Sequence, residues 1–172
     1  MSLTISIKNV IDKEIIDFHK SLFSPTVFIE GKFLNSFLGD CKIIVCYHKN
    51  NPILFWPLLI SPFKIKESYI PEFSYYIGPH FTNYFYTQPE HSQFSLRNNS
   101  IKKAIEIISK LFKKIHFHTN LKEIDIRPFI WACNENRYQI KVKTQYSAIK
   151  DLSINNHLSF RKLHKRNLAK AL

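Results

Sequence analysis

Two apolar segments joined by a turn constrain this chain more than any other feature of its sequence. Residues 42–47 are rich in β-branched side chains and almost wholly apolar, and residues 53–60 are apolar again. Residues 49–52, Lys-Asn-Asn-Pro, supply the turn between them. A hairpin with no polar face must be covered on both sides by other elements. Pro57 cannot donate to a strand ladder, so we expect a bulge or an edge position there.

The residues before this hairpin predict a strand followed by two helices. Residues 3–7 alternate between apolar and polar types, which is the period of a strand. Residues 11–23 place their apolar side chains mostly on one helical stripe, and Pro25 supplies the break after it. A second short helix is expected over residues 28–37, with Gly39 as its stop.

More elements are predicted after the hairpin. Residues 63–96 are rich in Pro, Tyr, Phe and His, and the stretch is too long and too aromatic to be a passive connection. Ser100 is expected to cap an amphipathic helix over residues 101–113. Residues 115–119 then predict a strand, and Pro128 fits the first turn of a short helix.

The last part of the chain completes the predicted fold. Residues 138–149 show a strand pattern, and the tail from residue 153 is helical in composition. The whole order predicts an α/β chain of the α+β kind, with a mixed, mainly antiparallel sheet flanked by helices. We expect one domain over residues 1–151. Residues 152–172 are expected to form a basic helix that leads into a missing second domain.

Composition narrows the possible functions. The 25 Lys and Arg residues against 13 Asp and Glu give a net charge of +12, which favours anionic partners. A genome biased toward Ile, Lys, Asn and Phe codons would give the same charge without any such partner. None of the three cysteines forms a C-x-x-C pair, which argues against a disulfide framework or a zinc ribbon. No apolar run is long enough to cross a bilayer, so a cytoplasmic location is expected.

Two histidines raise the question of a metal site. His116 and His118 stand two residues apart in a predicted strand, so both project to one face, a spacing that can supply two metal ligands. No acidic or cysteine partner stands at a recognisable spacing. We therefore expect two histidines on a polar strand face and no bound metal.

Three segments in order resemble a known family. They are Tyr-Tyr-Ile-Gly-Pro at residues 75–79, Asp-Ile-Arg-Pro-Phe-Ile-Trp at 125–131, and the basic segment at 160–171. Together they are similar to landmarks of Fem-type proteins, which carry two tandem GNAT-like acyltransferase domains. The resemblance is to the first domain and to the helix that enters the second. It implies the acyl-CoA N-acyltransferase fold and transfer of an acyl or aminoacyl group to a small amine, from an acyl-CoA or an aminoacyl-tRNA.

The resemblance also implies roles for particular residues. Tyr75 and Tyr76 would wall the acceptor pocket, and Gly78 would permit close approach of a ligand to the backbone. Asp125 and Arg127 would orient the acceptor through charge-assisted hydrogen bonds. The structural alternatives are that the aromatic loop covers the core, and that the aspartate caps a helix and pairs with the arginine. No residue is singled out as a general base, and no covalently bound cofactor is expected.

One element of such enzymes is absent. GNAT enzymes hold the donor pyrophosphate on a glycine-rich turn at a helix N-terminus, where oriented N–H groups favour phosphate. The three glycines of this chain, Gly31, Gly39 and Gly78, are isolated. The domain is therefore expected to be incomplete as a catalyst, and a surface left uncovered would favour self-association.

The basic tail supports a rival hypothesis. Arg161, Lys165 and Arg166 follow the last acidic residue, Asp151, and a helix of one charge sign can neutralise phosphates of a tRNA or another polyanion. Residues 84–86, Tyr-Phe-Tyr, offer rings on which bases would stack. These features predict a nonenzymatic basic module that binds nucleic acid. Alternatively, the tail helix packs against the missing domain.

Overall fold

A computed structural model of the chain describes residues 3–9, 15, 18–37, 40–64, 66–72, 74–119 and 125–143. The chain divides into two units, Met1–Ile140 and Lys141–Leu172, and the account below concerns the first. The predicted basic helix over 152–172, with Arg161, Lys165 and Arg166, lies outside the described residues.

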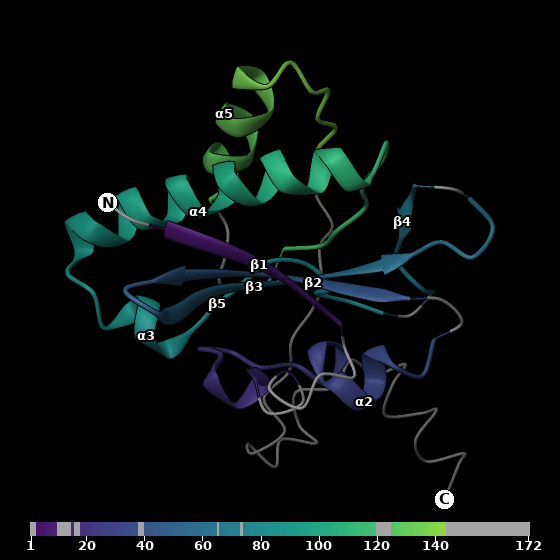
Figure 1. Ribbon diagram of the computed structural model, residues 1–172, viewed down its shortest axis with the longest axis horizontal. Helices are drawn as coiled ribbons and strands as arrows, with labels where there is room; N and C mark the ends of the chain where they lie inside the picture. Colours follow the sequence, from purple (N-terminus) through teal and green to yellow (C-terminus); the bar gives the residue numbers. More distant parts are fainter. Residues whose placement is uncertain are drawn as a thin grey trace, which may run out of the picture. The chain divides into compact units, whose positions relative to one another are not determined.

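Five strands of the first unit form one antiparallel sheet (Figure 1). Strand β1 (Leu3–Asn9) pairs with β2 (Cys41–His48), and β2 pairs with β3 (Asn51–Ile60). The other side of β3 pairs with two short strands, β4 (Ser68–Tyr69) and β5 (His80–Phe81). The predicted first strand and the predicted hairpin are confirmed, as is the mixed α+β class with an antiparallel sheet.

The hairpin turn follows from its two central residues. Lys49 and Asn50 both adopt positive φ angles, 50° and 65°, between the paired residues His48 and Asn51. Two successive positive φ angles define a type I′ turn, whose twist matches that of the flanking strands. The register shifts between Cys46 and Tyr47, which is where the hairpin has its irregularity.

Pro57 explains why β3 has two short partners on one side. The N–H of Ile60 donates to Asp40 O, on the β2 side, whereas Ile53 O accepts from the N–H of Thr82, on the opposite side. Because successive residues of a strand turn their backbone groups to alternate sides, Pro57 N faces the side of β4 and β5. It falls between the stretches paired with each of them. Pro57 thus occupies a local edge position, one of the two alternatives expected.

Helices cover both faces of the sheet (Figure 1). The 22-residue helix α4 (Glu90–Leu111) lies over one face, and α5 (Arg127–Glu135) packs on α4. The other face is covered by two 3-10 helices, η1 (Phe18–Ser21) and η2 (Val27–Ile29), and by α2 (Gly31–Leu34). The one-turn helix α3 (Asn83–Tyr86) precedes α4. Helix α5 confirms the predicted short helix with a proline in its first turn.

The predicted start of the long helix at Ser100 is wrong. Helix α4 begins at Glu90, and Pro89 is its N-cap residue. Ser100 is a buried interior residue whose hydroxyl donates to Arg97 O at 3.0 Å. Serine hydroxyls inside helices commonly bond to a carbonyl of the preceding turn, as the Ser100 hydroxyl does, so Ser100 does not cap a helix. Residues 63–96 therefore contain β4, β5, α3 and the first turns of α4.

Four other predicted elements differ from the structure. In the described part of residues 11–23, Ile15 is helical, but η1 is a 3-10 helix and Leu22 forms an isolated bridge with Thr82. The predicted helix over 28–37 is divided into η2 and α2. Residues 115–119 form no strand, because the N–H of His116 donates to the Ser68 hydroxyl at 2.7 Å instead of to a neighbouring strand. The described part of 138–149, residues 138–143, contains no strand either.

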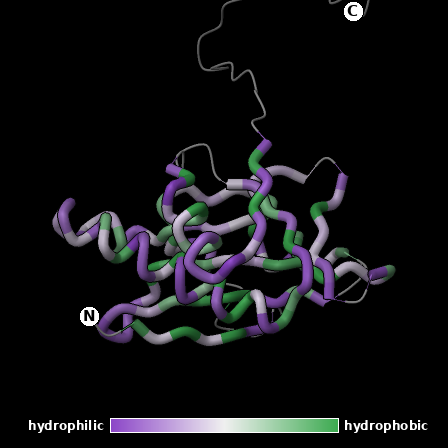
Figure 2. The backbone as a smooth tube through the Cα atoms, turned by 90° about the horizontal axis from the view of Figure 1, so that it is seen from above, coloured by the Kyte–Doolittle hydropathy of each residue, from purple (hydrophilic) through white to green (hydrophobic). Residues whose placement is uncertain are grey.

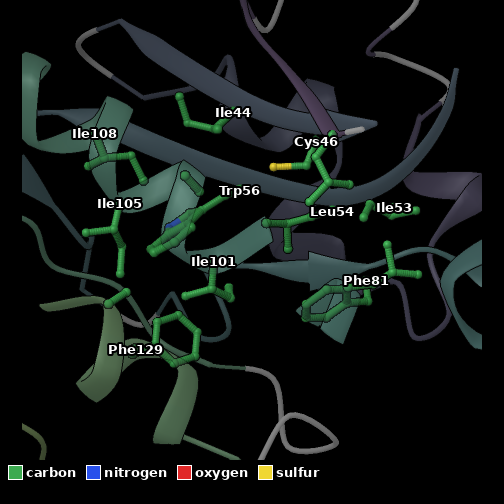
Figure 3. Packing of buried hydrophobic residues seen from close by; sticks show 14 of the residues in the cluster. Ile44, Cys46, Ile53, Leu54, Trp56, Phe81, Ile101, Ile105, Ile108 and Phe129 are labelled. Atoms are coloured by element: carbon green, nitrogen blue, oxygen red, sulfur yellow. The ribbon is translucent and has the colours of Figure 1, made fainter. Parts of the chain in front are cut away.

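Alternate residues of the hairpin contribute to two separate cores. The residues that face α4 and α5 include Leu58 and four that Figure 3 labels, Ile44, Cys46, Leu54 and Trp56. The residues that face η2 and α2 include Ile43, Val45, Phe55 and Leu59. Figure 2 shows hydrophobic stretches, coloured green, within the described part of the chain. The alternation has the period of two that strands impose, and both faces are apolar. The expectation of a hairpin buried on both faces is confirmed.

Candidate functional site

The loop over residues 74–79 holds a strained residue next to an exposed ring. Tyr76 has a φ of 61°, in the left-handed region that side chains other than glycine seldom adopt. Its carbonyl oxygen lies 2.7 Å from Nε2 of the buried His80, which fixes the peptide in place. Tyr75 is 50% exposed. The loop therefore presents two tyrosine side chains from a rigidly held backbone.

Gly78 is required by the chain's own packing. A Cβ atom at this position would lie 2.1 Å from the carbonyl oxygen of His118, closer than any contact of that kind allows. The N–H of His118 also donates to Ile77 O at 2.9 Å. The glycine thus permits the two backbone segments to pack directly against each other. The space beside Gly78 that was expected for a ligand is occupied by the backbone of residue 118.

The two tyrosines end a row of five aromatic rings that sequence reasoning missed. Successive ring centroids are 5.0 Å apart from Phe37 to Phe33, 5.4 Å to Phe28, 6.0 Å to Tyr75 and 6.3 Å to Tyr76. All five side chains are partly or largely exposed. The three phenylalanines come from residues 28–37, far from the tyrosines in sequence. Their spacing there suggested only a helix with a buried face.

Asp125 and Arg127 are bonded to each other. The carboxylate accepts from Nε and Nη2 of the arginine, both at 2.8 Å, and from the arginine backbone N–H at 3.1 Å. The side-chain hydrogen bond from Arg127 lowers the pKa of Asp125. The pairing of the structural alternative is therefore present, but the N-cap residue of α5 is Ile126, so Asp125 stands one residue before the cap position.

The sequence-predicted acceptor residues fall into two groups on opposite faces of the sheet. The ring of Tyr75 packs against Phe28, which belongs to the core beneath η2 and α2. Arg127 begins α5, whose residues Phe129 and Ala132 belong to the core on the α4 face. No contact among the described residues joins the two groups. The aromatic loop is therefore the part of the predicted site that remains a candidate for binding.

The backbone groups of His116 and His118 are bonded to neighbouring segments of the domain. The Ser68 hydroxyl donates to His116 O at 3.2 Å and accepts from the N–H of the same residue at 2.7 Å. Burial lowers the pKa of His118. Within the described residues, no group of three or more His, Cys, Asp and Glu side chains is arranged to hold a metal ion.

The described cysteines are core residues without a reactive environment. Cys41 and Cys46 are buried, and burial raises the pKa of each thiol to about 12. The thiol of Cys46 donates to Ser100 O at 3.6 Å, across the interface between β2 and α4. Burial also raises the pKa of Cys133. Such thiols remain protonated and are poor nucleophiles at neutral pH.

The proposed base-stacking rings at residues 84–86 are largely committed to packing. Phe85 is fully buried, with its centroid 4.2 Å from that of Phe81. Tyr86 packs against Phe23 at 4.0 Å. A buried ring cannot stack on a base, so the expectation of a three-ring platform is wrong at its central residue.

Buried His80 should make folding stability depend on pH. Desolvation lowers its pKa below the ordinary value of 6.5, so the unfolded chain binds the proton more readily. Stability is complete above pH 6.5 and falls as the pH drops below it, by up to about 1.4 kcal/mol per pH unit for each such histidine. Urea unfolding between pH 7.5 and 5 should show this slope, and His80→Gln should reduce it. An unchanged slope in that variant would contradict the assignment to His80.

Comparisons with protein-family models, with curated proteins and with solved structures each found no match. Among the described residues, no helix combines the length and the apolar character needed to cross a membrane. The described residues thus form a mixed α+β domain with an antiparallel sheet between helical layers. Its function is therefore inferred below from the residues exposed at its surface.

Proposed function

We propose that this chain is an incomplete GNAT-like acyl-transfer domain that binds an amine acceptor beside Tyr75 and Tyr76, with an acyl-CoA or an aminoacyl-tRNA as the donor in the complete enzyme. The observation that carries the proposal is the left-handed backbone of Tyr76, held by His80 next to a half-exposed ring. Such a conformation costs about 1–3 kcal/mol and persists where the surroundings enforce it, often at binding sites.

The chemistry of the aromatic row suits an amine. At neutral pH an aliphatic amine carries a positive charge, and a cation within about 6 Å of an aromatic centroid is attracted to the ring face. Tyr75 and Tyr76 lie at one end of five partly exposed rings, which extends the surface available to the acceptor. The helix-covered antiparallel sheet is the fold class that the resemblance implies, which also supports the proposal.

The transfer itself has a simple balance. The acceptor, bound as an ammonium ion, loses one proton to become a nucleophile. Its nitrogen then forms a bond to the acyl carbon and loses a second proton, and the bond from that carbon to the thiol sulfur or the tRNA oxygen breaks. The leaving group takes up one of the two protons, and the other is released to solvent. The role argued for this chain is to bind and orient the acceptor, which lowers the entropic part of the barrier.

An acceptor-binding role predicts a selective effect on amine affinity. Because the domain is expected to be incomplete as a catalyst, binding of a panel of small amines, including linear polyamines, should be measured by calorimetric titration of the parent and of Tyr75→Ala. Loss of one ring contact should raise the Kd for the amine about three- to fivefold. Phe94→Ala is a matched control, because Phe94 is 48% exposed but lies on α4.

Two results would contradict this role. One is no measurable binding of any amine tested, and the other is an equal change in the amine Kd for the Tyr75 and Phe94 variants. A mobility-shift titration at two salt concentrations tests the rival nucleic-acid-binding module, for which tight binding with a steep salt dependence is the expected result. No observation on the described residues favours that rival.

A further inference from the structure

A pocket of about 520 Å³ opens at the amino-terminal end of α4, on the opposite side of the sheet from the aromatic row. We propose that it binds the phosphate group of a small phosphorylated molecule. Its polar walls come from β1, the β2–β3 turn and the segment around the start of α4, and they include Thr4, His48, Lys49, Asn50, Gln88 and Ser92. The volume exceeds that of inorganic phosphate and lies in the range of small-molecule sites, so the ligand has a body beyond its phosphate.

Strand geometry explains why His48 reaches this end of α4. Even-numbered residues of β2 face α4, and the Cys46 thiol bonds to Ser100 O of that helix. The step from Cys46 to His48 along β2 is about 6.6 Å. A step of that length from Ser100 toward the start of α4 covers about four helical residues. His48 therefore lies below the first turns of α4, and the type I′ turn places Lys49 and Asn50 beside it.

The start of a long helix is suited to an anion. The first N–H groups of a helix have no acceptor within the helix, and the helix dipole adds a partial positive charge there. Pro89, the N-cap residue, makes no side-chain capping bond, and its carbonyl accepts from the N–H groups of Ser92 and Gln93 at 2.8 and 3.0 Å. The N–H groups of Glu90 and His91 precede these in the first turn, between Pro89 and Ser92, which line the pocket. A phosphate at this end of the helix would accept hydrogen bonds from such N–H groups.

His48 provides the independent observation. The residue lines the pocket and is only 5% exposed, yet its side-chain Nδ1 has no hydrogen-bond partner among the described residues. Desolvation, and then the positive charge of Lys49, lower the pKa of His48. A buried polar atom without a partner is unfavourable and points to a missing ligand or water. The Gln88 amide, in contrast, already donates to Tyr84 O and Thr87 Oγ1, so it forms a wall of the pocket.

Two charges near the pocket act in opposite directions. Lys49 is exposed beside His48 and attracts an anion. Glu90 is the acidic residue in the first turn of α4, so its carboxylate competes with a bound anion for the same positive end of the helix. This opposition makes the proposal testable by two substitutions of opposite effect.

The experiment is calorimetric titration of the full chain with inorganic phosphate, at constant ionic strength in sodium chloride. The parent should bind phosphate, Lys49→Gln should weaken binding about five- to tenfold, and Glu90→Gln should tighten it about twofold. Lys110→Gln is the matched control, because it removes the same charge about 30 Å away at the other end of α4 and should change nothing. His48→Phe should weaken binding severalfold without lowering the thermal midpoint.

Either of two outcomes overturns the proposal. The first is no measurable binding of phosphate to the parent, and the second is an equal loss of affinity in the Lys49 and Lys110 variants, which would show a nonspecific charge effect. If His48→Phe fails to fold, the phosphate affinities of the Lys49 and Glu90 variants still test the proposal. The site does not depend on the proposed acceptor site, so phosphate binding without amine binding would support this inference and contradict only the proposed function.

Discussion

Trp56→Ala is expected to lower the free energy of unfolding by about 3–5 kcal/mol, the largest effect of any substitution considered. Trp56 is fully buried in the middle of β3, and its ring makes edge contacts with Phe117 at 5.0 Å and Phe129 at 5.8 Å. Figure 3 shows the ring pointing from the sheet toward Ile101 and Phe129. Removing it would leave a cavity at the junction of the sheet with both α4 and α5.

Two further variants make this prediction specific. Trp131, the other tryptophan of the chain, is 43% exposed on α5, so Trp131→Ala should cost less than about 1 kcal/mol. Trp56→Phe should cost much less than the alanine variant, because Trp56 Nε1 has no partner among the described residues and its loss removes a buried unpaired donor. Urea unfolding measures all three. Equal effects at the two tryptophans would contradict the packing described.

Gly78→Ala should also be strongly destabilising, by about 3 kcal/mol, although it adds only one methyl group. The added carbon would lie 2.1 Å from His118 O, so one of the two backbone segments must move. Movement would break the bond from the His118 N–H to Ile77 O and strain the neighbouring Tyr76.

The control for this prediction lies in the same loop. Tyr75→Ala removes a large but half-exposed side chain and should cost less than about 1 kcal/mol. A Gly78→Ala protein with the stability of the parent in chemical denaturation would show that the two segments do not approach as described.

The first three strands were the most predictable part of the fold, whereas the short strands β4 and β5 were not predicted. The central hairpin of the sheet is apolar on both faces, and Lys49 and Asn50 lie in a turn whose length fixes the register. Helix α4 was recognised only from residue 101 onward. Residues 90–99 contain just two large apolar side chains, Phe94 and Leu96, so its first turns carry no helical apolar stripe.

The candidate sites were less predictable, because they depend on contacts between distant segments. Sequence singled out Tyr75 and Tyr76 but not Phe28, which is their neighbour only after folding. Spacing likewise gave no reason to place His48 at the start of α4, since about forty residues separate them. Asp125 was assigned two alternative roles, and geometry favours the one in which it binds Arg127.

The most direct test of the proposed function is a nuclear magnetic resonance titration of the isotope-labelled chain with the amine of the panel that binds the parent most tightly. The account predicts that the largest backbone shift changes occur at residues 74–80 and at His118, whose N–H bonds to the loop. Shift changes that avoid this loop, or none at saturating amine, would contradict an acceptor site beside Tyr75 and Tyr76.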